Sequence, residues 1–368
     1  MDFCIICNEG FEDLVSKELK NICNISSKIE RGIVLFKGNL EDVVKFCYKT
    51  QSAKKVLKLI SKFIIEDDTA LFNEISKIDF SFIDGSFLVR SNKHSLEKEI
   101  GALIYKKIKN PNVSLKNPDY VIYVNYLNNN EKTEISLGID LCAIDLSKRS
   151  YKIFTHPSSI KGTLAYFLVA LSGYKGKGLF LDPCSGAGTI STEAGFIASK
   201  ISPRYFDKSD IFYLNQFKDV NLKELLSKID DEIISKEDSK LIDIRNYDVD
   251  LQAVNAVKKN LKIAGIEKYI FSAKGDIDWL ETKFDENSVD FIVSNPPSYT
   301  STNQKKNDKF YERFFYQTEF VLSKKGKIIL LLNSKRPIEF ATKYKLKSNL
   351  ERQFQLGDKE MYVFSFKK

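Results

Sequence analysis

The 368-residue sequence predicts an α/β protein with a doubly wound C-terminal sheet and a smaller α+β N-terminal part. Two observations carry this prediction. After residue 160, apolar strand-like runs alternate with helical runs, which is typical of a mostly parallel sheet with helices on both faces. Before residue 150, short strands alternate with amphipathic helices, which favours α+β units. The length agrees with two or three domains.

The first α+β region is expected over residues 1–65. Its strands and helices alternate as Phe3–Cys7, 14–22, Gly32–Phe36, Leu40–Tyr48 and Val56–Ile65. Cys4 and Cys7 form a C-x-x-C pair, which invites a metal site. Positions i and i+3 of a strand face opposite sides, however, and no second Cys/His pair follows at zinc spacing. We therefore predict core cysteines and no metal.

A second α+β region is expected over residues 66–152. A helix starts at Ser95, which can cap it, and the strand candidates are Ser86–Arg90, Tyr120–Tyr126 and Glu134–Ile139. Lys106, Lys107 and Lys109 lie at the end of this helix. Cations there either complement the helix dipole in solvent or contact phosphates, and the sequence favours neither interpretation.

The composition narrows the class of partner. The net charge is +8, and because the first 150 residues are close to neutral, most of the surplus lies in the C-terminal part. A basic surplus suits nucleic acid without requiring it. The six cysteines show no disulfide framework, which favours a reducing cytoplasm, and no run resembles a membrane span or signal peptide. His94 and His156 have no partner pattern for a metal or a general base.

The C-terminal part is organised around residues 178–192, GLFLDPCSGAGTIST. An apolar run stops at Asp182, a loop carries Gly186 and Gly188, and a helical run opens at Thr189. This is a strand, a glycine turn and a helix, the unit with which open α/β sheets bind nucleotide-like ligands. Buried strand-to-helix turns also use glycine, so the loop alone is weak support.

Two details favour S-adenosylmethionine over a dinucleotide at this loop. A dinucleotide fingerprint needs a third glycine where Ser191 stands. Asp182 lies where a carboxylate can reach a cationic ligand.

Further strands and helices follow the loop. An apolar helix ending at Gly173 precedes it, and a charge-rich insertion with one helix, Leu222–Ile234, separates it from the next strand. The later candidates are strand 241–247, a helix ending at Gly265, strands Ile270–Ala273 and Val289–Val293, helix Tyr311–Leu322, and strands Lys327–Leu332, Gln353–Leu356 and Met361–Phe366.

Four successive strand tips carry polar residues: Asp182, Asp248, Asp276 and Asn295. In a doubly wound sheet these tips line one crevice. A carboxylate at Asp248 suits two ribose hydroxyls, and Asp276 can accept a hydrogen bond from an adenine amino group. Asp is also common at strand ends and helix caps, yet four such residues in this order point to a nucleoside-bearing cofactor.

The most specific signal is Asn295-Pro296-Pro297-Ser298-Tyr299, which follows the fourth strand. An exocyclic amine on a base is a poor nucleophile because its lone pair is delocalised into the ring. The Asn295 side-chain oxygen and a backbone carbonyl, that of Pro296, can accept its two hydrogens and localise the lone pair for attack on a sulfonium methyl. The proline pair stiffens the loop, and a nearby aromatic ring can stack on an extruded base.

With these motifs the chain resembles the class I, S-adenosylmethionine-dependent methyltransferases that modify a base amine. GFEDLVSKEL, TQSAKKVL, FLVRSNKHSLEKEIGALI and AIDLSKRSYKIFTHPSSIKGTLA resemble the RNA methyltransferases with ferredoxin-like and THUMP domains, and so does the insertion ISPRYFDKSDIFYLNQF. The most similar group is the tRNA guanine-N2 methyltransferases acting at position 6 of the acceptor stem, followed by ribosomal RNA guanine-N2 relatives.

The resemblance implies three domains: ferredoxin-like over 1–65, THUMP over 66–152, and a Rossmann-like methyltransferase domain with a mostly parallel seven-stranded sheet over 153–368. It implies a monomer in the cytoplasm whose THUMP domain grips the 3′ end of tRNA while the acceptor stem reaches the active site. The residues that would bind S-adenosylmethionine are Asp182, Ser185, Gly186, Gly188, Thr189, Asp248, Asp276 and Asn295. The catalytic set would be Asn295, Pro296, Pro297 and Tyr299.

Two departures from the family pattern stand out. Ser298 follows the prolines where the family usually has an aromatic residue, so Tyr299 either turns in to stack or the base is held differently. Gly162 stands where relatives often have an acid. The alternatives are ribosomal RNA guanine-N2 methylation, adenine-N6 methylation of DNA or RNA, and a non-catalytic RNA-binding protein. A Cys184 nucleophile is disfavoured because Cys184 lies in the cofactor loop.

Overall fold

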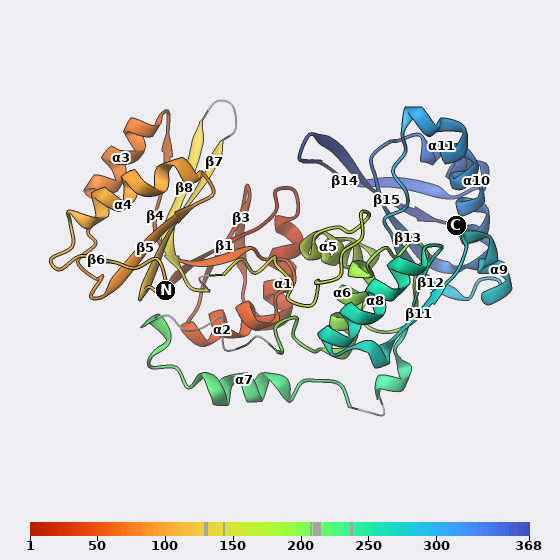
Figure 1. Cartoon of the computed structure of the whole chain (residues 1–368), viewed down its shortest axis with the longest axis horizontal. Helices are drawn as coiled ribbons and strands as arrows, with labels where there is room; N and C mark the ends of the chain where they lie inside the picture. Colours follow the sequence, from red (N-terminus) through yellow and green to blue (C-terminus); the bar gives the residue numbers. More distant parts are fainter. Residues whose placement is uncertain (129–131, 143, 207, 209–214, 236–237) are drawn as a thin grey trace. The chain divides into compact units, whose positions relative to one another are not determined.

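The computed structural model describes residues 1–128, 132–142, 144–206, 208, 215–235 and 238–368 (Figure 1). The chain divides into two compact units. The N-terminal unit comprises Met1–Leu146 and Asp207–Lys228, and the C-terminal unit comprises Ser147–Phe206 and Ile229–Lys368. The insertion predicted after residue 200 therefore contributes to both units, and its residues 207, 209–214 and 236–237 lie outside the described ones.

The N-terminal unit is built on an eight-stranded sheet with the order β2-β3-β1-β4-β8-β7-β5-β6. Its strands are β1 (Asp2–Ile6), β2 (Ser27–Glu30), β3 (Ile33–Lys37), β4 (Lys55–Ile65), β5 (Ser86–Ser91), β6 (Asn112–Val113), β7 (Tyr120–Asn128) and β8 (Thr133–Asp140). The long strand β4 pairs antiparallel with β1 on one edge and with β8 on the other. The two α+β regions expected from the sequence thus share one continuous sheet.

Four helices accompany this sheet: α1 (Glu12–Cys23), α2 (Leu40–Lys49), α3 (Asp68–Lys77) and α4 (Glu97–Tyr105). A capping box starts α2, because the Asn39 side chain accepts from the Asp42 N–H and the Asp42 carboxylate accepts from the Asn39 N–H. The expected Ser95 cap is wrong: Ser95 lies inside a 3-10 turn, η1 (His94–Leu96), and α4 begins at Glu97 without a side-chain cap.

Cys4 and Cys7 are core residues, as predicted, with 0% and 4% of their surface exposed. Burial raises the pKa of the Cys4 thiol to about 12, so it stays protonated at neutral pH. Within the described ranges, no group of three or more His, Cys, Asp or Glu side chains is arranged to hold a metal ion.

The C-terminal unit contains a seven-stranded sheet with the order β11-β10-β9-β12-β13-β15-β14. The strands are β9 (Leu179–Asp182), β10 (Asp243–Asp248), β11 (Ile270–Lys274), β12 (Val289–Ser294), β13 (Leu322–Leu332), β14 (Lys347–Leu356) and β15 (Lys359–Lys367). Strands β9 to β13 pair in parallel and β15 pairs antiparallel with β13 and β14, so the predicted mostly parallel sheet is confirmed. The strand order reverses between β9 and β12, the position where open α/β sheets bind ligands.

The remaining helices are α5 (Gly162–Ser172), α6 (Thr189–Ser199), α7 (Leu222–Asp230), α8 (Leu251–Ala264), α9 (Leu280–Lys283), α10 (Gln304–Val321) and α11 (Pro337–Lys343). Short 3-10 turns are η3 (Asn215–Phe217), η4 (Asp238–Leu241), η5 (Glu267–Tyr269), η6 (Ile277–Trp279) and η7 (Ser301–Asn303). As predicted, α8 ends at Gly265, which adopts the left-handed conformation (φ 68°).

Several predicted boundaries are wrong, among them that of β14, which begins at Lys347 instead of Gln353. Helix α10 begins seven residues before the predicted Tyr311, because its polar first turns carry no apolar repeat. Strand β13 begins at Leu322 instead of Lys327, and α7 ends at Asp230 instead of Ile234.

Aromatic and aliphatic side chains form the core between α10 and the sheet. Tyr311, Phe314 and Phe315 of α10 are at most 1% exposed and pack with Phe364 and Phe366 of β15. This packing holds α10 against the face of the sheet, with its first turns at the carboxyl edge. Among the described residues, no helix combines the length and the apolar character that crossing a membrane requires.

Candidate active site

The structure brings the four predicted strand-tip residues to one edge of the C-terminal sheet. Asp182 and Asp248 end β9 and β10, Asp276 follows β11, and Asn295 follows β12. Because β11, β10, β9 and β12 are consecutive and parallel, their carboxyl ends share this edge.

The loop after β9 needs glycine at two positions. Gly186 and Gly188 have φ angles of 52° and 75°, in the left-handed region that side chains disfavour. A Cβ on Gly188 would lie 2.7 Å from a methyl carbon of Val257, and a Cβ on Gly186 would overlap the Ser158 hydroxyl. The Gly186 N–H donates to Asp248 Oδ2 (2.8 Å), so the two strand tips are joined directly.

Asp182 is fully buried, and only one of its two carboxylate oxygens is hydrogen-bonded within the described residues. Its Oδ1 accepts from Ser294 Oγ (2.7 Å) and from the Cys184 N–H (3.3 Å). Its Oδ2 has no hydrogen-bond partner among the described residues, and neither do the buried hydroxyls of Ser185 and Thr189. Burial raises the pKa of Asp182 to about 7, and the nearby negative charge of Asp248 adds to the effect. Unpaired buried polar atoms in one loop are typical of a site that a polar ligand completes.

Asp248 and Asp276 lie at the carboxyl ends of two neighbouring strands, β10 and β11. Asp248 Oδ1 accepts from the Asp250 N–H (2.9 Å), and each carboxylate oxygen keeps a further lone pair for a ligand. Asp276 Oδ1 caps η6 through the Asp278 N–H (3.1 Å) and lies 3.4 Å from Arg313 Nη2 of α10. Arg313 was not predicted, because no sequence pattern links α10 to the strand tips.

In the loop after β12, a hydrogen bond fixes the orientation of the Asn295 side-chain amide. Asn295 Nδ2 donates to the Ser158 carbonyl over 3.0 Å. Since a carbonyl only accepts, the side-chain oxygen of Asn295 points away from Ser158, and no described residue donates to it. The Tyr311 hydroxyl donates to the Pro297 carbonyl (2.8 Å), whereas the Pro296 carbonyl has no such donor within the described chain.

Tyr299 is anchored rather than free. Its N–H and C=O pair with the Asn333 side chain at 2.8 and 2.9 Å, and its hydroxyl donates to Asp308 Oδ1 (2.6 Å). Its ring lies against Tyr311, with 6.2 Å between centroids. Asn333 was missed, although it follows the apolar run of β13 as a further polar strand tip.

The segment 154–159 covers the glycine loop and was also missed. The fully buried side chain of Asn260, on α8, accepts from the Phe154 N–H (3.0 Å) and donates to the Phe154 carbonyl (2.8 Å) and to the Ala187 carbonyl (3.2 Å). His156 contacts Ser158 Oγ through Nδ1 (2.7 Å) and Asp250 Oδ2 through Nε2 (3.4 Å). Side chains of α8 and of its N-cap therefore hold the segment whose carbonyl orients Asn295.

A buried ion pair supports the same region from the side of α6. Arg149 Nε and Nη2 donate to the two Glu193 oxygens at 2.8 and 3.1 Å, and the Tyr151 hydroxyl donates to Glu193 Oε1 at 2.8 Å. A Cβ on Gly162 would lie 2.7 Å from the Arg149 side chain. A side chain at position 162, where relatives often have an acid, would therefore displace this ion pair in the present arrangement.

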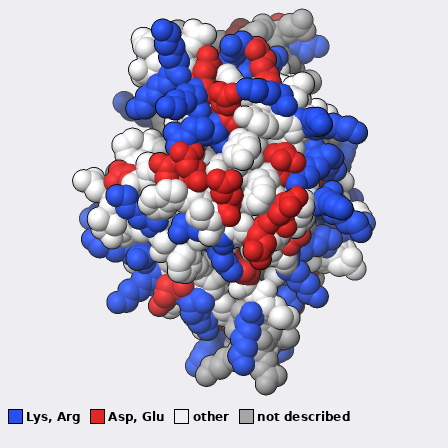
Figure 2. All heavy atoms as spheres, turned by 90° about the vertical axis from the view of Figure 1, so that its right-hand side faces the viewer, with Lys and Arg blue, Asp and Glu red and all other residues white. Residues whose placement is uncertain are grey.

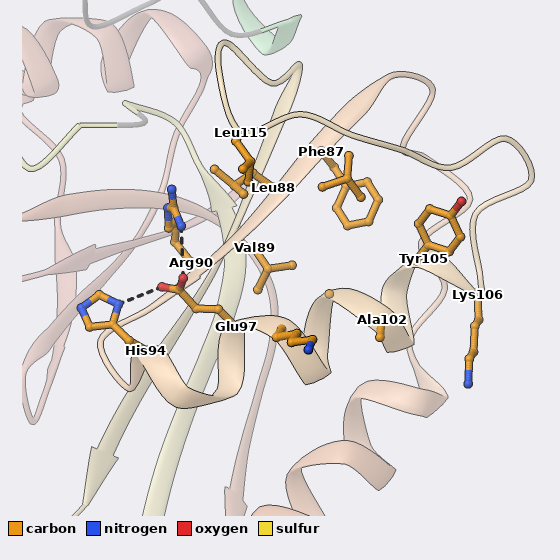
Figure 3. A pocket seen from close by; sticks show the side chains of 13 residues that line it. Phe87, Leu88, Val89, Arg90, His94, Glu97, Ala102, Tyr105, Lys106 and Leu115 are labelled. Carbon is orange, nitrogen blue, oxygen red and sulfur yellow. Dashed lines mark hydrogen bonds and ion pairs between the residues drawn. The ribbon is translucent and has the colours of Figure 1, made fainter.

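The N-terminal unit carries a separate apolar groove of about 610 Å³ between β5, β6 and α4 (Figure 3). Figure 3 shows Arg90 and His94 directed at Glu97 at one end and Tyr105 and Lys106 at the other. The lining residues are Phe87, Leu88, Val89, Arg90, His94, Glu97, Lys98, Gly101, Ala102, Tyr105, Lys106, Val113 and Leu115. Lys107 instead donates to the Ile78 carbonyl (3.0 Å), and Lys109 is exposed.

A mostly parallel sheet with a glycine loop at its reversal point defines a Rossmann-like domain that binds nucleotide-like ligands at this edge. The chain belongs to the RMKL-like methyltransferase domain family, whose model matches residues 149–359. Ahead of it, the RlmL ferredoxin-like domain matches residues 2–57 and the THUMP domain matches residues 53–135.

Two curated relatives illustrate the range of this family. A tRNA (guanine(6)-N2)-methyltransferase of Methanocaldococcus jannaschii is 27% identical over 355 residues, which cover 90% of both chains. A ribosomal RNA large subunit methyltransferase K/L of Vibrio parahaemolyticus is 25% identical over 317 residues. That match covers 80% of this chain and only 43% of the longer relative.

Solved structures share the fold over the full chain. The crystal structure of SMU.472 complexed with SAH superposes with a TM-score of 0.77 at 22% identity, covering 100% of this chain and 97% of that one. TrmN from Thermus thermophilus superposes with a TM-score of 0.68 at 20% identity, covering 100% of both chains.

Proposed function

We propose that the chain transfers a methyl group from S-adenosylmethionine to the exocyclic N2 amine of a guanosine in tRNA, at position 6 of the acceptor stem. The observation that carries the chemistry is the fixed amide of Asn295, which leaves its oxygen and the Pro296 carbonyl as acceptors at the end of β12. The substrate assignment rests on the match over 90% of both chains to a relative with that specificity.

The residues present fit the cofactor. The unpaired Asp182 Oδ2 and the buried Ser185 and Thr189 hydroxyls need polar partners, which a polar ligand at the glycine loop would supply. When bound, S-adenosylmethionine supplies an electrophilic methyl group on a cationic sulfur. The residues we assign to the methionine end are Asp182, Ser185, Gly186, Gly188 and Thr189, with Asp248 for the ribose and Asp276 for the adenine.

The amine site works by positioning. An amine that donated its two hydrogens to Asn295 Oδ1 and to the Pro296 carbonyl would keep its lone pair available for attack on an electrophilic methyl group, so no strong base would be needed. Pro297 stiffens the loop, and its own carbonyl is taken by Tyr311. We assign Tyr299 as the aromatic platform for the extruded base, because its backbone and hydroxyl are both fixed.

The N-terminal unit supplies the RNA grip in this proposal. Unpaired bases at the 3′ end of tRNA suit an apolar groove that offers the exposed ring of Tyr105, while the Lys98 and Lys106 side chains suit the adjoining phosphates. The protein would act as a monomer in the cytoplasm.

Ribosomal RNA is the second candidate substrate, because the K/L relatives match 80% of the chain. The deciding experiment is methylation of a tRNA transcript with guanosine at position 6, of ribosomal RNA fragments and of duplex DNA, using labelled S-adenosylmethionine. Nucleoside mass spectrometry should detect N2-methylguanosine at position 6 of the tRNA. Incorporation of label into ribosomal RNA alone would identify ribosomal RNA as the substrate instead of tRNA. Detection of N6-methyladenosine as the product would overturn the proposed guanine-N2 activity.

A further inference from the structure

A cluster of lysines on α10 lies near the loop after β12, residues 295–300, to which we assign the amine site and which we call the catalytic loop. Neither the strand-tip chemistry nor the groove of the N-terminal unit accounts for this cluster. Lys305, Lys306 and Lys309 are exposed in the first two turns of this helix. We call these three residues the α10 lysine face. Figure 2 shows Lys and Arg over much of the surface that α9, α10 and α11 provide, with acidic side chains gathered near its middle.

The opposite side of the same turns is fastened to the catalytic loop. The Asn307 side chain donates to the Thr300 carbonyl (3.1 Å), and Asp308 accepts from the Tyr299 hydroxyl (2.6 Å). One turn further on, Tyr311 donates to the Pro297 carbonyl (2.8 Å). Because these three contacts follow each other along one side of α10, the lysines on the other side of the helix are held at a fixed position relative to the loop.

The lysines have no ion-pair partner among the described residues, unlike other basic residues close by. Arg336 pairs with Glu339, and Lys343 pairs with Glu312. The positions are also electrostatically unfavourable, because the N-terminus of a helix carries partial positive charge. The first turn of α10 contains no acid, and its N-cap residue, Asn303, makes no capping hydrogen bond.

We propose that the α10 lysine face binds the phosphates of the RNA strand that flanks the target guanosine. The inference rests on the proposed RNA methyltransferase function and adds a docking surface to the same site. Three cations with no acidic partner suit a polyanion. They lie across one helix diameter, about 10 Å, from the side that is fastened to the loop, so they would meet the phosphates next to the target nucleotide. Binding of RNA phosphates would explain why the helix tolerates the free-energy cost of three cations at its N-terminus.

The test compares two matched triple variants. Lys305→Gln/Lys306→Gln/Lys309→Gln removes the face, and Lys324→Gln/Lys325→Gln/Lys347→Gln removes the same charge at the opposite, amino end of β13. The probe is a tRNA transcript with guanosine at position 6, titrated by fluorescence anisotropy at several salt concentrations. The affinity for S-adenosylmethionine is measured in parallel by calorimetry.

The α10 variant should bind the transcript at least about tenfold more weakly, and its log–log salt slope should fall by about 2 to 3, since each phosphate contact contributes about 0.9. Its melting temperature should not fall, because glutamine at a helix start removes an unfavourable charge, and its affinity for S-adenosylmethionine should be unchanged. An RNA affinity and salt slope equal to those of the control variant would overturn the proposal. If the unmodified protein neither binds nor methylates RNA, the proposed function itself fails.

Discussion

Asn295 Nδ2 lies 3.0 Å from the carbonyl oxygen of Ser158, so a residue of the segment before α5 sets the orientation of an amide that follows β12. The two residues are 137 positions apart in the sequence. The same segment is held by Asn260 through the Phe154 backbone. The acceptor that we assign to the substrate amine therefore depends on contacts that extend from α8 to the catalytic loop.

Asn295→Ala should lower the rate of methyl transfer by at least about 100-fold, roughly 3 kcal/mol, because the acceptor for the substrate amine is lost. The affinity for tRNA should stay unchanged, since the substitution removes no charge. Single-turnover kinetics and anisotropy measure the two quantities. Asn303→Ala, an exposed amide at the start of α10, is the control. Turnover within a factor of two of the unmodified protein would remove Asn295 from the amine site.

Asn260→Asp should lower both stability and turnover. The aspartate can still accept from the Phe154 N–H, but the carbonyls of Phe154 and Ala187 lose their donor and face a carboxylate. A loss of about 1–3 kcal/mol in the free energy of unfolding is expected. The turnover number should fall about tenfold, because Ser158 no longer holds Asn295.

The matched control is Asn255→Asp, which makes the same change at an exposed position of α8. Urea unfolding and the turnover number at saturating substrate separate the two effects. A destabilised variant with unchanged turnover would show that Asn260 supports only the fold.

Asp182 should make cofactor binding dependent on pH. Burial raises its pKa in the free protein to about 7, so at pH 6 the carboxyl is mainly protonated. A cationic ligand favours the ionised form, and the affinity for S-adenosylmethionine should therefore rise as pH increases from 6 to 8. Calorimetry in buffers of different ionisation enthalpy should detect proton release at pH 6. Asp182→Asn should bind more weakly and without this pH dependence; a pH-dependent variant would contradict the assignment.

Gly188→Ala should destabilise the cofactor loop more than backbone strain alone explains. The left-handed conformation costs a side chain about 1–2 kcal/mol, and the new Cβ would also approach Val257 at 2.7 Å. Gly173→Ala isolates the first effect, because Gly173 has a φ of 85° and open space where its Cβ would be. Thermal unfolding should rank Gly188→Ala as the less stable variant, with weakened binding of S-adenosylmethionine. Equal losses of stability in the two variants would mean that the Val257 side chain moves aside without a cost in free energy.

Tyr299→Phe and Tyr299→Ala distinguish two roles of this side chain. The phenylalanine keeps the ring and loses only the hydrogen bond to Asp308, so the rate should fall by less than about tenfold. The alanine loses the stacking surface, and the KM for RNA should rise about tenfold or more, since stacking contributes roughly 1–3 kcal/mol per base. If both variants behave alike, Tyr299 acts through its hydroxyl.

The parts of the site that could be predicted are those encoded locally. Asp182, Asp248, Asp276 and Asn295 each follow an apolar run, and strand tips of a parallel sheet meet at one edge. Asn260, Ser158 and Arg313 carry no such local signal, because their roles arise from contacts more than 30 residues away. The start of α10 was missed for a related reason: its first turns are polar and are stabilised by tertiary contacts to the catalytic loop.

The N-terminal sheet shows the same limit. The strands of both α+β regions were largely foreseen, but no local pattern reveals that β4 pairs on both edges. Strands β2 and β6 were not predicted, since both are short and contain no buried side chain, and neither was helix α3, which buries only Leu71 and Ile75.

The double pairing of β4 has a consequence for how this protein can be cut and recombined. A fragment starting after residue 65 would leave β8 with an open edge, and one ending before residue 55 would do the same to β1. Unpaired edges of this kind invite self-association. The ferredoxin-like and THUMP segments should therefore be inherited, expressed and exchanged as one module, although family models describe them as two.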